Sequence, residues 1–344
     1  MTELLNTLYV QTQGACLHLE HDAVRIVVPD TPGRHTQPLR RIDSIVLYGH
    51  VTVSSELLTR CAQDSRPIVW MTQGGRFLAR LDGPVRGNVL LRHAQHTTHA
   101  DPTLRLAIAR ACVAGKLQSS RQLLLRAARD LTGARQARLR AAAQAHADLL
   151  QAIRDAHDLD QLLGIEGQAG RLYFEAFPTM LRPDLDIEPP TGRTRRPPTD
   201  PVNCLLSFGY GLLRAAVHGA LEQIGLDPYV GFLHGIRPGK PALALDLMEE
   251  FRPLLADRFA LNLLNRRQLG SSHFERLPGG AVRLTDAGRK LLLIEWQKAR
   301  ARTWSHAILG RKIQAALLPV VQARILARHL RGELPAYLPW SMVG

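Results

Sequence analysis

Residues 104–129 read LRLAIARACVAGKLQSSRQLLLRAAR, and this stretch divides the chain into two unlike parts. Leucine, isoleucine and alanine recur in it at helical spacing, which predicts one long helix. Asp101-Pro102-Thr103, directly before it, is a typical helix start. The pattern after it is also helical, and we expect further helices over 136–155, 160–177, 201–224, 242–257, 259–268, 285–301 and 304–331.

The residues before about 85 have the pattern of a small β-rich domain that carries one helix. His21-Asp22 and Gly74-Gly75 mark two of the expected turns between strands. SSELLTRCAQDS (54–65) has a serine cap and apolar spacing suited to a short helix. Short apolar segments typical of strands lie within 7–28, 42–54 and 66–81.

These two parts predict an α+β fold, with a small N-terminal β-rich domain followed by a larger all-α domain. The length of 344 residues is sufficient for two domains. The expected division is a β-rich domain over 1–85, a linker over 86–102, a helical domain over 103–332 and a C-terminal tail over 333–344.

The composition excludes several classes of protein. With 45% hydrophobic and 22% charged residues, the chain is not disordered throughout. No apolar run approaches the ~18 residues of a membrane helix, and the N-terminus lacks the basic and apolar regions of a signal peptide. The four cysteines are widely spaced without a CxxC pair, so we expect neither disulfides nor a zinc ribbon. The expected compartment is therefore the cytoplasm, without membrane contact.

The charge of the chain points to a polyanion. Of its 44 basic residues only five are lysine, so 39 are arginine, whose planar guanidinium can grip phosphate through two hydrogen bonds. The net charge of +14 is concentrated in residues 105–344, which carry 34 basic and 21 acidic side chains, a net of +13. Aromatic residues make up only 5%, which favours phosphate contacts with duplex or branched nucleic acid over base stacking. The alternative is that these charges form ordinary solvated helix faces.

Three separated segments hold residues that could form a metal site. In the first, Glu166 lies between Gly164 and Gly167 at the start of an expected helix, and the glycines would let a ligand or another backbone approach closely. At ~100° per residue, Glu175 falls on the opposite side of that helix, so the two carboxylates are not expected to act together.

The second segment joins a loop to a helix. His234 lies in the loop 232–242, whose proline and glycine residues would let it fold back beside the following helix. On that helix Asp246 and Glu249 are spaced i,i+3 and share a face, whereas Glu250 follows the apolar face and is less easily placed.

In the third segment, Asn203, Ser207 and Tyr210 or Arg214 recur at helical spacing and could reach a phosphate or steady a ligand. Carboxylates with one imidazole suit Mn²⁺ or Mg²⁺, which can polarise a phosphodiester and activate a hydroxyl. Spacing alone favours the ordinary interpretation, in which the glutamate starts a helix, the histidine is a hydrogen-bonded loop residue and the acids pair with Arg252 or Arg258.

Three motifs in fixed order resemble one family: GIEGQAGRLYF (164–174), NCLLSFGYGLL (203–213) and GFLHGIRPGKPALALDLMEEFRPLLADR (231–258). They are similar to the universal CRISPR-associated integrase–endonuclease of spacer acquisition. The likeness includes SIVLYGHVTVSSELL, GGRFLARL and GPVRGNVLLRHAQ upstream, so it covers the chain from about 7 to 330. The phrase GNVLLRHAQ suggests the subtype I-C branch.

The resemblance implies a homodimer formed through the β domains and a C-terminal all-α catalytic domain. Two such dimers would flank a dimer of a small ferredoxin-like Cas partner, giving a heterohexamer. The implied metal ligands are Glu166, His234 and Glu249, with Asp246 as a supporting catalytic residue; this chain has glutamate at 249 where many members have aspartate. The residues in matching motifs that could contact DNA or order the site are Arg171, Asn203, Tyr210 and Lys240.

The resulting hypothesis is a CRISPR adaptation integrase and endonuclease that uses Mg²⁺ or Mn²⁺. It would join the 3′-OH ends of prespacer DNA to the CRISPR repeat by transesterification and cut branched DNA. Two alternatives stay open at this point. One is a structure-specific junction or repair nuclease, and the other is a non-enzymatic architectural DNA-binding protein.

Overall fold

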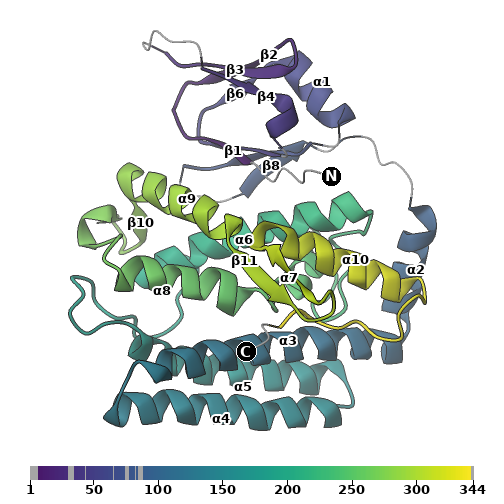
Figure 1. Cartoon of the computed structure of the whole chain (residues 1–344), viewed down its shortest axis with the longest axis vertical. Coiled ribbons are helices and arrows are strands. Elements are labelled where there is room, and N and C mark those ends of the chain that lie inside the picture. The colour runs from purple at the N-terminus through teal and green to yellow at the C-terminus, as the bar shows by residue number, and fades with distance from the viewer. Residues whose placement is uncertain are drawn as a thin grey trace. The chain divides into compact units, whose positions relative to one another are not determined.

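The computed structural model describes residues 7–29, 35–42, 44–64, 66–73, 77–81, 83 and 88–341. The chain divides into two compact units, Met1–Gly87 and Asn88–Gly344. The first unit is rich in strands and the second is mostly helical (Figure 1). The predicted fold class is therefore confirmed.

In the described part of the N-terminal unit, the strands form two four-stranded sheets. One has the order β1-β5-β7-β8 and is parallel except for β8, and the other has the order β4-β3-β2-β6 and is antiparallel except for β6. Leu17, Ile45 and Leu57 belong to the buried core of this unit. The elements are β1 (Thr7–Val10), β2 (Cys16–Glu20), β3 (Ala23–Val27), β4 (His35–Pro38), β5 (Ser44–Tyr48), β6 (Thr52–Val53), α1 (Ser55–Gln63), β7 (Ile68–Met71) and β8 (Phe77–Leu81).

Local signals explain two of these elements. The predicted turn at His21-Asp22 joins β2 to β3, and His21 adopts a left-handed φ of 53°. The predicted short helix is α1, and the Ser54 hydroxyl caps it by accepting the N–H of Leu57 at 3.4 Å. The predicted turn at Gly74-Gly75 lies outside the described residues.

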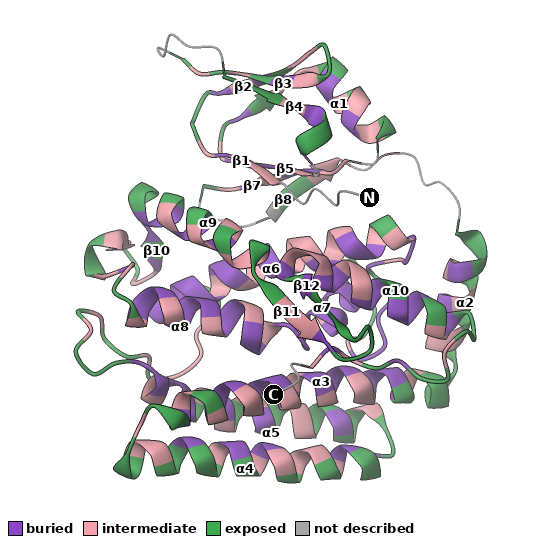
Figure 2. Ribbon diagram, in the orientation of Figure 1, coloured by how far each residue is buried: buried purple, intermediate pink, exposed green. Residues whose placement is uncertain are grey.

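The C-terminal unit begins with a layer of long helices. Helices α3, α4 and α5 pack against one another, and α4 buries one side and exposes the other (Figure 2). The apolar helix α6 packs against α7, α8 and α10. The helices are α2 (Val89–Ala100), α3 (Pro102–Arg129), α4 (Gly133–Asp155), α5 (Leu159–Ala176), α6 (Pro201–Ile224), α7 (Ala242–Met248), the π-helix η3 (Arg252–Asp257), α8 (Arg258–Asn265), α9 (Asp286–Ala301) and α10 (Leu318–Leu330).

The sequence predicts no segment that could cross a membrane, but helix α6 meets the criteria of length and composition for one. Pro201–Ile224 is long and apolar enough by those two criteria, with a mean hydropathy of 1.3. However, 56% of its apolar window is buried inside the C-terminal unit, as in a core helix. Cys16, Cys61, Cys112 and Cys204 form no disulfide in the structure.

Four segments of the C-terminal unit differ from the sequence prediction. The predicted helix 304–331 is wrong before residue 318, because β11 (Thr303–His306) and β12 (Arg311–Gln314) form a hairpin there. A second hairpin, β9 (Phe274–Arg276) with β10 (Val282–Leu284), was not predicted. The predicted helix 242–257 is interrupted at 249–251, ahead of Pro253, which lacks an N–H donor. Helix α2 lies within the stretch predicted as a linker.

Candidate catalytic and metal-binding site

Asp246, on α7, holds the loop that carries His234. Its buried carboxylate accepts the backbone N–H groups of Phe232, Leu233 and His234 at 2.5, 2.9 and 2.9 Å. It also lies 2.6 Å from Nδ1 of the His234 ring. This contact keeps the ring proton on Nδ1 and leaves the Nε2 lone pair for a metal ion or a proton. The loop therefore folds back as predicted, and Gly231 permits it because a Cβ there would lie 2.6 Å from Asp246.

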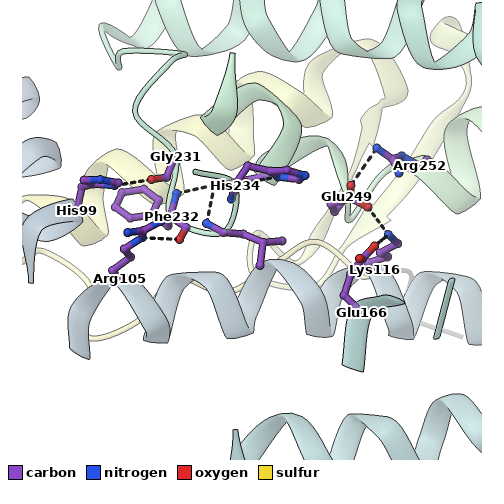
Figure 3. Close-up of polar contacts among 11 residues, drawn as sticks. His99, Arg105, Lys116, Glu166, Gly231, Phe232, His234, Glu249 and Arg252 are labelled. Carbon is purple, nitrogen blue, oxygen red and sulfur yellow. Dashed lines mark hydrogen bonds and ion pairs between the residues drawn. The ribbon is translucent and has the colours of Figure 1, made fainter. Parts of the chain in front are cut away.

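Three residues that sequence analysis does not single out fasten the same loop from α2 and α3. Gln95 donates to two backbone carbonyls just before the loop, at 2.8 Å each. Nδ1 of His99 lies 2.6 Å from the carbonyl oxygen of Gly231, and Arg105 donates to that of Phe232 at 2.9 Å (Figure 3). The position of the histidine is therefore set from several directions.

Glu166 and Glu249 converge on one ammonium group. Nζ of Lys116, on α3, lies 2.8 Å from Oε2 of Glu249 and contacts Oε1 of Glu166, on α5. Arg252 contacts the other oxygen of Glu249 at 2.9 Å. In Figure 3 the His234 ring extends toward Glu249. Two carboxylates far apart in the sequence thus share one positive charge.

Glu249 is ionised despite its burial. It is only 2% exposed, and burial alone would raise its pKa. Arg252, Lys116 and His234 outweigh burial and lower the pKa of Glu249 to about 2. Glu249 therefore carries a negative charge near neutral pH.

A cavity of about 340 Å³ opens beside Lys116 and Glu166. Gly167 and Gly170 line it, and a Cβ at either would meet no described atom within 4 Å. Glycine inside a helix costs about 1 kcal/mol relative to alanine, and here it leaves open space rather than a close backbone contact. Of the described residues on its wall, the basic ones are Lys116, Arg171, Arg193, Arg195 and Arg252, and the acidic ones are Glu166, Glu175 and Asp257.

Tyr210 stacks between two arginines on this wall. Cζ of Arg193 and Cζ of Arg252 lie 5.3 and 4.8 Å from the centroid of its ring. The Tyr210 hydroxyl donates to one oxygen of Asp257 at 2.6 Å, and the Tyr173 hydroxyl donates to the other at 2.9 Å. Tyr210 therefore orients Arg252 toward the carboxylate pair.

The other residues expected to contact DNA differ in exposure. Asn203 is buried and orders the loop 190–200, because its Oδ1 accepts from Arg193 at 2.8 Å. Arg171 is exposed and lines the cavity, where it pairs with Glu175 at 3.4 Å. Lys240 lies in the turn after His234 and does not belong to the described wall of the cavity.

The donor set fits a hard divalent ion. No group of three or more His, Cys, Asp or Glu within the described residues is already arranged around a metal position. Instead, Lys116 lies between the two carboxylates, which would repel each other without a cation. Two carboxylates with an imidazole whose Nδ1 is bonded to Asp246 are ligands that Mn²⁺ and Mg²⁺ accept.

Lys116 is the residue of this cluster that the sequence analysis does not single out. It lies in α3 between Val113 and Leu117, both of which are 0% exposed. A charge on such a face requires a partner. A rare lysine among apolar residues of a predicted helix was therefore the signal that could have identified Lys116.

Comparison with known proteins identifies one family. A family profile described as "CRISPR associated protein Cas1" matches residues 8–298. The "CRISPR-associated endonuclease Cas1 1" of Moorella thermoacetica is 46% identical over 338 residues, which is 98% of each chain. The "CRISPR-associated endonuclease Cas1 2" of Rhodospirillum rubrum is 45% identical over 346 residues, which is 99% of each chain.

Solved structures share the fold at lower identity. A Cas1 protein from Thermotoga maritima has a TM-score of 0.82 at 24% identity, over 95% of this chain and 97% of that chain. A casposase bound to integration product has a TM-score of 0.82 at 23% identity, over 97% and 93%. A Cas6-RT-Cas1–Cas2 complex has a TM-score of 0.82 at 22% identity, over all of this chain and 37% of that chain. The profile match and the relatives aligned over nearly their whole length show that this chain belongs to the Cas1 family.

Proposed function

We propose that this Cas1 protein joins the 3′-OH ends of prespacer DNA to the CRISPR repeat and also cuts branched DNA. The observation that carries the proposal is the convergence of Glu166 and Glu249 on Lys116, beside the His234–Asp246 pair and a basic cavity. Family membership and the endonuclease names of the relatives support it.

In the proposed site, Glu166, Glu249 and Nε2 of His234 would hold Mg²⁺ or Mn²⁺. The ion, when bound, polarises the phosphodiester and activates the attacking hydroxyl. Asp246 holds the proton on Nδ1 of His234, so that Nε2 can act as a ligand.

The arginines of the cavity would bind the DNA backbone and align the reacting groups. The 3′-oxygen of the prespacer forms a bond to a phosphorus atom of the repeat, and the bond from that phosphorus to the 3′-oxygen of the neighbouring repeat nucleotide breaks. The proton of the attacking hydroxyl passes to the departing oxygen. One phosphodiester replaces another, so no external energy source is required, and water in place of the hydroxyl gives cleavage.

The proposed partners are double-stranded and branched DNA, a second copy of this chain and a small Cas protein. The fold shared with a Cas6-RT-Cas1–Cas2 complex supports a partner of the Cas2 type. The homodimer through the β-rich domain, the heterohexamer, subtype I-C and the cytoplasmic location stay predictions.

One observation favours a second candidate, a non-enzymatic architectural DNA-binding protein. Lys116 and Arg252 already neutralise the two carboxylates, and a purely structural ion-pair network has the same arrangement. The two functions differ in their requirement for a metal ion.

A strand-transfer assay tests the proposal. The full-length protein is given labelled DNA with 3′-OH ends and a plasmid that carries the repeat, with Mn²⁺ or with EDTA. We expect transfer only with Mn²⁺, and none for His234→Ala, which should still bind duplex DNA. Glu275→Gln removes a half-buried carboxylate that pairs with Arg283 and does not line the cavity, and this control should transfer like the wild type.

Three results would contradict the proposal in different ways. Full transfer by His234→Ala would disprove the assigned site. Tight duplex binding without transfer in Mn²⁺ would favour the architectural protein. Efficient cleavage of a flap substrate without transfer into the repeat would favour the repair nuclease.

A further inference from the structure

A second cavity of the C-terminal unit lies beside the hairpin β11–β12 and has a volume of about 310 Å³. The π-helix η3 contributes to both cavities: Arg252 and Asp257 line the first, and Leu254 lines the second. The wall of the second cavity contains Arg258, Arg302 and Lys312, and none of the described residues on it is acidic. A concave surface of one sign attracts ions of the opposite sign.

Arg258 lies among other arginines without a compensating carboxylate. Burial, followed by the charges of Arg126, Arg302 and Arg266, lowers the pKa of Arg258 to about 10. No acidic group in the described part of the chain contributes to this shift. Like charges gathered in this way destabilise the free protein, and a bound anion would relieve their repulsion.

Aromatic packing, rather than an acid, holds Arg258 in place. Its Cζ lies 5.2 Å from the centroid of the Trp304 ring, and Trp304 packs edge to face against Trp340 at 5.5 Å. Trp340 is 1% exposed and donates to the carbonyl of Ser305 at 3.3 Å. The guanidinium is therefore preorganised by stacking, which leaves its N–H donors for a ligand.

Exposed arginines elsewhere in this unit have a different environment. Arg283 pairs with Glu275 at 2.6 Å, and Arg328 pairs with Glu333 at 2.9 Å. Arg258, Arg302 and Lys312 form no such ion pair among the described residues, although Glu295 lies close enough to Arg302 to interact with it electrostatically.

We propose that this cavity is a second DNA-backbone site, in which Arg258, Arg302 and Lys312 bind phosphate away from the candidate catalytic centre. The inference rests on the proposed function, since the phosphate belongs to the same DNA. Phosphate fits better than a base, because Trp304 is already packed against Arg258 and Trp340. Guanidinium groups bind phosphate oxygens through paired N–H donors.

The salt dependence of DNA binding tests this site. Arg302 and Lys312 are both exposed, so Arg302→Gln/Lys312→Gln should keep the fold, which thermal unfolding verifies. The matched control, Arg283→Gln/Arg328→Gln, removes two charges that have carboxylate partners. Affinity for a labelled duplex is measured for each full-length protein between 50 and 200 mM NaCl.

We expect the cavity variant to bind the duplex about tenfold more weakly and to reduce the slope of log Kd against log salt by about 1 to 2. The control should change the slope by less than half as much. If the double variant unfolds at a lower temperature than the wild type, Lys312→Gln alone replaces it. The slope of log Kd against log salt should then fall by about 1.

Two results would overturn the inference. A wild-type slope for the cavity variant, while the wild-type protein binds DNA, would disprove the second site and leave the proposed function intact. Polyglutamate serves as a model of an acidic protein. If the Arg302→Gln/Lys312→Gln variant binds polyglutamate more weakly than the wild type but binds DNA equally well, the cavity is assigned to an acidic protein partner. Failure of the wild-type protein to bind DNA would instead disprove the proposed function itself.

Discussion

Glu249 and Glu250 are neighbours in one turn, yet their surroundings give them opposite charge states. They are 2% and 1% exposed, so both are buried to the same degree. Two cations contact Glu249, and its pKa is lowered to about 2. Glu250 has no cation among its described partners, and burial raises its pKa to about 8.

Glu250 connects the C-terminal segment to this turn. The Tyr337 hydroxyl donates to its carboxyl group at 2.8 Å, Gln322 donates at 3.1 Å, and the backbone N–H of Trp340 donates as well. Tyr337 and Trp340 lie within the stretch predicted as a tail, but they are 4% and 1% exposed. The C-terminal segment is therefore part of the core next to the candidate site.

The difference shows that burial keeps a carboxyl group protonated unless neighbouring cations outweigh it. Cations around Glu249 keep a negative charge where a metal ion would need it. Around Glu250 the neutral donors lower the pKa too little to offset burial, so the group stays protonated at neutral pH, and their hydrogen bonds hold the turn in place. One turn thus combines Glu249, an ionised group that could bind a metal ion, with Glu250, a protonated group that stabilises the fold.

Of the changes to the surroundings of Glu249, the removal of Arg252 should lower the stability of the protein most. We expect Arg252→Met to lower the unfolding free energy by about 3 kcal/mol at pH 7, because a buried carboxylate loses a counter-charge. Urea denaturation in EDTA measures this. In a Glu249→Gln background the same substitution should cost less than half as much, and equal costs in both backgrounds would contradict the ion pair.

The two carboxyl groups should affect stability in opposite pH ranges. The folded pKa of Glu250, about 8, lies above its ordinary value of 4.5, so its contribution is complete below pH 4.5 and is lost as the pH rises to 8. The folded pKa of Glu249, about 2, lies below 4.5, so its contribution is complete above pH 4.5 and is lost as the pH falls to 2.

The Glu250→Gln variant should therefore gain stability relative to the wild type as the pH rises from 5 to 8. The gain should reach at most about 1.4 kcal/mol per pH unit, the value for one proton. Urea denaturation at several pH values measures it. Tyr337→Phe removes one donor but keeps the carboxyl group, so it should retain a pH dependence, and identical slopes for Glu250→Gln and the wild type would contradict the raised pKa.

Local signals predict the helices that begin and end with clear caps. The helix predicted over 201–224 has these bounds because Asp200 caps its start and Gly225 ends it with a φ of 90°. Helix α5 is similar, since Asp158 caps it and the helix begins at Leu159, one residue before the predicted start. The hairpin β11–β12 was missed because its apolar residues also fit helical spacing, although Gly310 forms a turn with a φ of 60°.

Long-range partners explain why the candidate site was predicted only in part. The family motifs give Glu166, His234 and Glu249, but no spacing predicts that Lys116 lies between the two glutamates. Glu250 could not be placed from the helix pattern, because its partners Tyr337 and Trp340 lie 87 and 90 residues further along the chain. Its role depends on tertiary packing, which no local pattern contains.

The most direct test of the account compares strand transfer by Glu249→Gln and Glu250→Gln in Mn²⁺. Both substitutions remove one buried carboxyl group from the same turn. The account predicts that Glu249→Gln lowers the rate by about 10³-fold, the scale of losing a main electrostatic contributor, and that Glu250→Gln stays close to the wild type. Equal rates for the two variants would contradict the assignment of Glu249 to the catalytic site.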